Sequence, residues 1–257
     1  MDVNKKSNIR RVEEYFRGEL EKIGYEGVIG VADFSGVYHG LMPAQKARLE
    51  KISGDRFQDF LENGSIVCIG IAYPEHAIDC INVESGGMID KDAWNVYARE
   101  YHEINGLLNA ISKKMADRFG GIPVPATLEG ITNEVGNVEE YYGMTISHRV
   151  VAEEAGLGWR GKNELILNDR YSCALRFASI ITSLPLTRGE PSKASCGACT
   201  ACLEVCPFLE KKEELKNYRE NCRRFINALG LEWDVCGKCI KACYRRGIFK
   251  DEFKLRS

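Results

Sequence analysis

Eight closely spaced cysteines are the residues of this sequence with the clearest chemistry. They begin with the run C-x2-C-x2-C-x3-C-P and continue as a single cysteine, a C-x2-C pair and one more cysteine after three residues. A cubic iron–sulfur cluster needs thiolates at its corners; such a run supplies three from one loop, while its fourth cysteine points to a second cluster. The spacing therefore predicts two 4Fe–4S clusters.

The eight thiols divide into two expected sets of four. The first cysteine set is Cys196, Cys199, Cys202 and Cys243. The second cysteine set is Cys206, Cys222, Cys236 and Cys239. The second set departs from a plain ferredoxin run, because Cys222 comes early and Tyr244 stands where a proline would follow Cys243. Clusters ligated only by cysteine have no open coordination site, so they pass single electrons to an acceptor elsewhere in the chain.

Two other uses of the thiols fit the sequence less well. A single structural zinc ion needs four ligands, typically from two separated C-x2-C pairs, whereas this chain offers a compact run of four. A disulfide framework is disfavoured by the odd total of 11 cysteines, by their clustering and by the absence of an apolar leader in the first residues.

The elements that must position this chemistry alternate between helices and strands. Apolar spacing predicts a helix over 8–24 and a long helix over 93–119, and buried strands over 27–33, 65–74 and 176–183. Shorter helices are expected at 43–53, 55–62 and 145–155, with short strands at 122–127 and 164–168. The fold class is α+β. A linker-like stretch at 185–195 divides the chain into predicted domains 1–187 and 188–257.

Composition places the chain among ordinary globular proteins. Apolar residues make up 44% and charged residues 28% of its 257 residues, and the net charge is -2. A basic excess, expected for a protein that lives on nucleic acid or an anionic membrane, is absent. No run approaches the length of a membrane span. We therefore expect a cytoplasmic protein without a membrane partner.

One glycine-rich stretch in the first part could approach a cofactor. The sequence contains no G-x-G-x-x-G after a strand, no G-x-x-x-x-G-K-[ST] and no C-x3-C-x2-C. What remains is AGLGWRGKN at 155–163, directly after a predicted helix. Its glycines let the backbone approach a ligand closely, and Lys162 and Asn163 can hydrogen-bond it. A helix C-cap followed by a tight turn explains the glycines equally well.

The chain resembles the epoxyqueuosine reductases, cobamide-dependent iron–sulfur enzymes related to reductive dehalogenases. The resemblance rests on AYP at 72–74, YAREYH at 97–102, the stretch SHRVVAEEAGLGWRGKN at 147–163, LPL at 184–186, and the cysteine sets with their early Cys222. These motifs cover about 70–257, and their order and spacing agree with the family.

This resemblance implies a nitroreductase-like domain that holds a base-off cobamide (cobalamin type), followed by a ferredoxin-like domain with two clusters that reduce the cobalt. An external donor of ferredoxin or flavodoxin type would supply the electrons. The residues implied in cofactor binding are Tyr97, Tyr101, His102, Arg149, Gly156, Gly158, Trp159, Lys162 and Asn163.

The expected catalytic residues are His102 and Tyr142. The family carries an aspartate, thought to donate a proton, 17 positions before the tryptophan; Tyr142 occupies that place, with Tyr141 as the alternative. A tyrosine hydroxyl, with a pKa of about 10, donates a proton less readily than a carboxyl group does. Of the remaining candidates, we expect the other histidines, His39, His76 and His148, at the surface. Cys68 is expected to be a buried hydrophobe, and Cys80 and Cys173 have no assignment.

The substrate expected from sequence is a small molecule. The family has a helical-repeat extension after the clusters that helps to hold tRNA, whereas this sequence ends 14 residues after Cys243 and is nearly neutral. Two alternatives stay open. The first is an electron-transfer protein that reduces a corrinoid or a partner protein; the second is a minimal tRNA epoxyqueuosine reductase.

Overall fold

A four-stranded antiparallel sheet forms the centre of the computed structural model, which describes residues 2–127 and 135–246. The strand order is β1 (Gly27–Asp33), β2 (Ser65–Ala72), β8 (Leu175–Thr182) and β5 (Gly121–Val124). All three pairings are antiparallel. The chain therefore has a mixed α/β fold. Strand 27–33 is confirmed at both ends, and strand 65–74 is confirmed except that it ends at Ala72.

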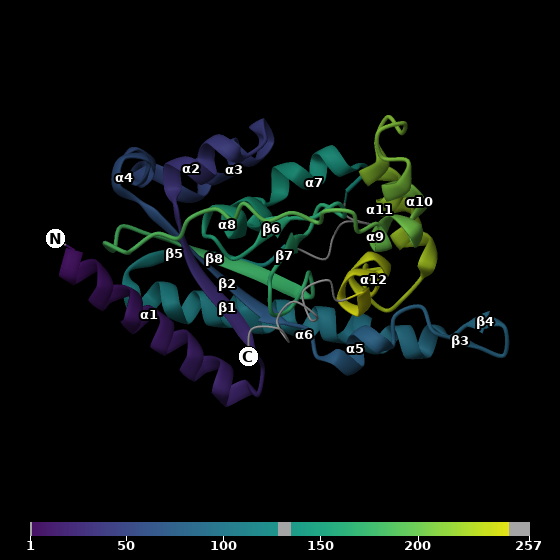
Figure 1. Cartoon of the computed structure of the whole chain (residues 1–257). Coiled ribbons are helices and arrows are strands. Elements are labelled where there is room, and N and C mark those ends of the chain that lie inside the picture. The colour runs from purple at the N-terminus through teal and green to yellow at the C-terminus, as the bar shows by residue number, and fades with distance from the viewer. Residues whose placement is uncertain (1, 128–134, 247–257) are drawn as a thin grey trace.

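The two faces of the sheet bury two separate apolar cores. Successive side chains of a strand point to opposite faces, so Val67 and Ile69 of β2 join one core while Ile66 and Cys68 join the other. Helices α1 (Asp2–Ile23) and α6 (Lys91–Phe119) cover the first face. The second is covered by α2 (Phe34–Gly40), α4 (Phe57–Asn63) and α8 (His148–Glu154) (Figure 1). Every residue of β2 is buried, as its apolar run requires.

Helix α6 is the longest element and carries several predicted site residues. Asp90 caps its start, with its carboxylate accepting from the backbone N–H of Ala93 at 2.9 Å. Gly120, in the left-handed conformation with φ 71°, ends it. The capped bounds confirm the predicted long helix, which begins two residues earlier than expected.

The remaining elements are short and surround this frame. Before α6 they are α3 (Pro43–Ser53), the 3-10 turn η1 (Gly54–Arg56), α5 (Glu75–Asp79), β3 (Glu84–Ser85) and β4 (Met88–Ile89). After it they are α7 (Val138–Met144), β6 (Trp159–Arg160) and β7 (Ile166–Leu167). Helix α7 has no counterpart among the sequence predictions. Asn137 caps it, and the backbone N–H of its first residue, Val138, donates to Glu220, from a distant part of the chain.

As far as residue 246, where the described part of the chain ends, the cysteine-rich part holds four helices at one end of the sheet. They are α9 (Ala201–Glu204), α10 (Pro207–Glu210), α11 (Tyr218–Leu229) and α12 (Lys238–Arg246). Figure 1 shows them gathered on the side opposite the N-terminal half of α1. In the described ranges, no helix has both the length and the apolar character needed to cross a bilayer.

Candidate functional site

The eight predicted cluster ligands come from three places in the cysteine-rich part. Four lie in the run that leads into α9 and α10, Cys222 lies on α11, and the last three lie at and along α12. Cys239 and Cys243 are four residues apart on α12, so they lie on the same face of that helix. A loop and two helices thus bring distant thiols to one region.

The thiols of each expected set are neighbours in the structure. Cys202 interacts electrostatically with Cys196, Cys199 and Cys243, the other members of the first cysteine set. In the second set, Cys222 has Cys236 and Cys206 as its neighbours, and Cys239 is surrounded chiefly by those same three. No three Cys, His, Asp or Glu side chains in 2–127 and 135–246 converge tightly enough to hold a single metal ion. The division into sets follows the expectation, while ligation of iron stays a prediction.

The chemistry of these thiols fits an iron–sulfur cluster. Burial, followed by neighbouring thiols, raises the pKa of Cys202 to about 11 and that of Cys222 to about 12. Burial likewise raises the pKa of Cys236 to about 11. Four thiolates crowded together at low solvent exposure repel one another, and bound iron removes that repulsion because it deprotonates and neutralises its ligands.

The loop at 159–163 lies against the first cysteine set. The Lys162 ammonium donates to the backbone carbonyls of Gly197 and Cys199, at 2.9 and 3.0 Å. Gly161 lies so close that a β-carbon there would stand 3.5 Å from the Cys196 sulfur. Lys162 is expected to contact a cofactor or substrate; its partners in the structure are backbone carbonyls of the loop that carries Cys196 and Cys199.

Helix α6 lies against the second cysteine set. The Trp94 indole N–H donates to the carbonyl of Cys236 at 2.7 Å. Gly237 has φ 76°, and a β-carbon there would stand 2.6 Å from the ring of Tyr97. Only glycine meets both conditions, the left-handed backbone and the close approach. Tyr97 therefore lies in direct contact with the turn that carries Cys236.

A half-buried arginine and several tyrosines form a polar group that sequence reasoning missed. Arg176 of β8 lies over the ring of Tyr101 at 4.4 Å and donates to Asn105 Oδ1 at 3.0 Å and to the carbonyl of Thr127 at 3.3 Å. These partners are neutral. The signal in the sequence is an arginine within an otherwise apolar strand, and nothing in the local sequence connects it with the tyrosines of α6.

Unsatisfied polar atoms surround this arginine. Tyr73, at the end of β2, lies beside Tyr97 with ring centroids 4.9 Å apart. Within the described residues, the hydroxyls of both tyrosines and Asn105 Nδ2 are buried without a well-formed hydrogen bond. Buried polar groups normally have partners, so this cluster of Tyr73, Tyr97, Tyr101, Asn105 and Arg176 (hereafter the Arg176 cluster) has unused hydrogen-bonding capacity.

The two expected catalytic side chains come from different helices, His102 from α6 and Tyr142 from α7. His102 is exposed and its ring stacks on Trp233, with centroids 3.6 Å apart and planes 11° apart, whereas Tyr101 is buried. Tyr142 is half-buried, while Tyr141 is 8% exposed. The nearest charged and polar groups of Tyr141 include Tyr101, Arg176 and Arg149. Tyr141, the alternative donor, is thus the tyrosine of α7 that faces the Arg176 cluster.

The prediction that His148 lies at the surface is wrong. The side chain is 4% exposed on the inner face of α8. Its Nε2 lies 2.7 Å from the carbonyl of Pro125, and its Nδ1 lies 2.8 Å from Ser179 Oγ. A carbonyl only accepts, so Nε2 carries the proton and Nδ1 accepts from the serine. Burial lowers the pKa of His148 to about 4. His39 and His76 are exposed, as expected.

The remaining predicted residues of the stretch 155–163 contact other parts of the chain. Gly156 has φ 71°, and a β-carbon there would stand 2.5 Å from the carbonyl oxygen of Glu190; at Gly158 the corresponding distance to the Leu167 oxygen is 2.0 Å. These glycines are required by backbone approach within the chain. Trp159 is buried, and Asn163 donates to the Cys173 sulfur at 3.4 Å.

Arg149 and two cysteines outside the cysteine sets, Cys68 and Cys173, are the last of the residues named in the sequence analysis. Arg149 donates to the carbonyl of Glu164, and burial lowers its pKa to about 10. Cys68 is fully buried in β2, as expected, and burial raises its pKa strongly. The contact between Cys173 and Cys243 had no signal in the spacing, because it joins the turn before β8 to α12.

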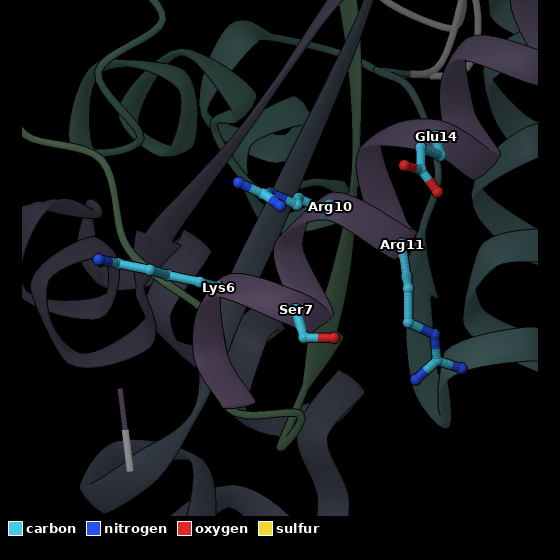
Figure 2. Close-up of a pocket in the computed structure, with 5 residues that line it drawn as sticks. All are labelled: Lys6, Ser7, Arg10, Arg11 and Glu14. Atoms are coloured by element: carbon cyan, nitrogen blue, oxygen red, sulfur yellow. The ribbon is translucent and has the colours of Figure 1, made fainter. Parts of the chain in front are cut away.

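A hollow beside α1 lies away from this chemistry. It is lined by Lys6, Ser7, Arg10, Arg11 and Glu14, all from one helix. Figure 2 shows Lys6 and Arg10 pointing to one side of the helix and Arg11 to the other, so the side chains do not converge on a common point. The side chains that line this hollow do not form a built site, and the cysteine region remains the candidate functional site.

Comparison with known proteins points to one class of enzyme. No family model matches the chain. Its sequence is 27% identical over 152 residues to the epoxyqueuosine reductase of Listeria monocytogenes, covering 58% of this chain and 36% of that protein. The enzyme of the same name from Leadbetterella byssophila is 31% identical over 138 residues, which cover 52% of this chain and 38% of that protein. The enzyme from Salmonella typhimurium is 38% identical over 87 residues, which cover 34% of this chain and 22% of that protein.

Two solved structures of epoxyqueuosine reductases also align. A selenomethionine-labelled enzyme gives a TM-score of 0.46 at 20% identity over 78% of this chain and 53% of that one. A complex with an epoxyqueuosine-modified tRNA stem loop gives 0.41 at 19% identity, over 78% and 52%. The matched region is about a third of the length of the first curated relatives. Over roughly half its length, this chain is similar in sequence to epoxyqueuosine reductases.

Proposed function

We propose that this chain is an oxidoreductase of the epoxyqueuosine reductase type, in which two 4Fe–4S clusters deliver electrons to a cobamide that reduces the substrate. The observation that carries the proposal is the grouping of eight thiols into two neighbouring sets of four, held against the loop at 159–163 and against α6. The sequence similarity to enzymes of that name supports it.

The chain's own residues would hold the clusters and exclude water from them. The first cysteine set lies under Gly161 and Lys162, and the second lies against Trp94 and Tyr97. Each cluster would pass one electron at a time. A low-potential donor of ferredoxin or flavodoxin type would reduce them, and the thiols require the reducing conditions of a cytoplasm. The domain boundary near 187 belongs to the same proposal, with the cobamide in the nitroreductase-like first part and the clusters in the ferredoxin-like second part.

The Arg176 cluster is where a cobamide or its substrate would meet unused polar groups. Tyr73, Tyr97 and Asn105 offer unsatisfied hydrogen-bonding atoms, and the guanidinium has neutral partners. A base-off cobamide, once reduced, supplies a strongly reducing and nucleophilic cobalt centre. Tyr101 and Arg176 would orient the bound group, and Tyr141 would hold one of the two protons that the reaction consumes, with solvent supplying the other.

The substrate that the relatives favour is epoxyqueuosine, in place of the small molecule expected from charge and length. Relatives with that name align over as many as 152 residues, and one solved enzyme carries an epoxyqueuosine-modified stem loop. Reduction of an epoxide consumes two electrons and two protons; the two proposed clusters would supply the electrons, and a tyrosine hydroxyl would supply one of the protons. We therefore propose epoxyqueuosine, presented on tRNA, as the substrate class.

Metal analysis followed by turnover tests the proposal. Protein purified without oxygen and reconstituted with iron and sulfide should contain two clusters per chain, and cob(II)alamin added under reducing conditions should change its corrin absorbance. With tRNA that carries epoxyqueuosine, nucleoside mass analysis should show loss of the epoxide. Absence of iron refutes the cluster assignment, and an unchanged corrin spectrum refutes the cobamide. Turnover of small epoxides alone would refute the tRNA substrate.

A matched pair of variants separates an enzyme from an electron carrier. Tyr141→Phe should abolish epoxide reduction while cobalt reduction continues, because only the donated proton is lost. Tyr142→Phe is the control, since that side chain is half-exposed. If neither substitution slows turnover, tyrosine is not the proton donor. If wild type reduces cobalt but no epoxide, the chain serves as an electron-transfer protein.

A further inference from the structure

Cys173 is a buried thiol outside both cysteine sets, and it lies against Cys243 of the first set. It is 2% exposed and belongs to the small apolar cluster around Trp159 that also contacts Cys243. Its backbone position is fixed by a turn in which Asn168 and Ser172 exchange two hydrogen bonds of 2.8 Å, with Ser172 at φ 53°. The fold therefore delivers this thiol specifically to a predicted cluster ligand.

The Cys243 sulfur has two neighbours outside the first cysteine set. The Ser172 hydroxyl donates to it at 3.2 Å. The Cys173 side chain packs in the same apolar cluster as Cys243 and interacts with it electrostatically. Asn163 donates to the Cys173 sulfur at 3.4 Å, which occupies the acceptor side of that thiol and leaves its S–H to point toward Cys243. A hydroxyl and a thiol placed in this way favour a negatively charged sulfur at Cys243.

Hydrogen bonds to a ligand sulfur change the redox behaviour of a cluster. A reduced cluster carries one more negative charge than the oxidised cluster, so donors aimed at its sulfurs stabilise the reduced form and raise the reduction potential. We propose that Ser172 and Cys173 are positioning residues of the first cluster, whose hydrogen bonds to Cys243 make that cluster easier to reduce. This inference rests on the proposed function, because it requires a cluster on the first cysteine set.

Redox titration of the whole reconstituted chain tests the inference. Iron content is measured first, and the reduced clusters are then followed by EPR; Cys243→Ala identifies the signal of the first cluster by its loss. Cys173→Ala and Ser172→Ala should each lower the ratio of reduced to oxidised first cluster about fivefold at a fixed potential, as expected for the loss of one ordinary hydrogen bond. Cys173→Ser, which keeps a donor, should restore most of that ratio.

The matched control is Cys68→Ala, which removes another fully buried thiol from β2, away from the cysteine sets. It should leave both potentials unchanged. Full iron content with an unchanged first-cluster potential in the Cys173→Ala and Ser172→Ala variants overturns the inference. Loss of about half the iron in Cys173→Ala also overturns it, because Cys173 is then a ligand. Wild type without iron would instead show that the proposed function has failed.

Discussion

Acidification should destabilise the folded chain through His148, which is buried in its neutral form. The ring lies between the carbonyl of Pro125 and the hydroxyl of Ser179, and it is 4% exposed. Protonation would place a cation in the core between β8 and α8, with Arg176 as a nearby charge of the same sign. The folded state therefore resists a proton that the unfolded chain accepts freely.

The direction and the size of the change in the free energy of unfolding follow from the pKa of His148 in the folded chain and in the unfolded chain. Burial lowers the pKa of His148 from 6.5 to about 4 in the folded chain. Between these values the unfolded state binds more protons, so the free energy of unfolding falls as the pH falls from 6.5 toward 4. The full effect is about 3 kcal/mol, at ~1.36 kcal/mol per pKa unit. Between pH 7 and pH 5 the loss in the free energy of unfolding is about 2 kcal/mol. For a chain of this size, that loss lowers the midpoint of thermal denaturation by roughly 4–8 °C.

Paired thermal denaturation isolates this effect from the carboxylates that titrate in the same range. Wild type and His148→Gln are scanned without oxygen at pH 7 and pH 5, and the two pH-dependent changes in midpoint are subtracted. Glutamine keeps an N–H donor and an oxygen acceptor but cannot take up the proton. Wild type should lose several degrees more than the variant. His76→Gln, which removes an exposed histidine, should behave like wild type. If wild type and His148→Gln lose the same number of degrees, the folded-state pKa argued for His148 is wrong.

Three further outcomes follow from the cysteine region. Cys243→Ala and Cys206→Ala should each remove about half of the bound iron, because each belongs to a different set; loss of all iron from either would show that the sets do not assemble independently. Gly237→Ala should destabilise the fold by about 1–3 kcal/mol, since its φ is 76° and the new carbon would stand 2.6 Å from Tyr97; an unchanged denaturation midpoint contradicts this. Lys162→Met should speed the bleaching of one cluster in air, because two hydrogen bonds to the cluster-binding loop are lost; equal bleaching rates for variant and wild type would exclude that role.

Local sequence signals determined the elements and the thiol sets. The strands at β1 and β2 and the helix α6 follow from apolar periodicity and caps, which depend on residues a few positions apart. The cysteine spacing predicted the two sets, since a cluster-binding loop takes several ligands from one short segment. Helix α7 escaped detection because part of its stabilisation comes from Glu220, on α11, and not from its own pattern.

Only the tertiary structure decided which side chains meet. The burial of His148, the stacking of His102 on Trp233, the Arg176 cluster, and the contact of Cys173 with Cys243 each join segments separated by many residues. Such contacts arise when strands pair across the sheet and helices pack on its faces, and a single sequence does not record which distant positions become neighbours. Spacing therefore revealed the thiols, and packing between distant segments determined the surroundings of each thiol.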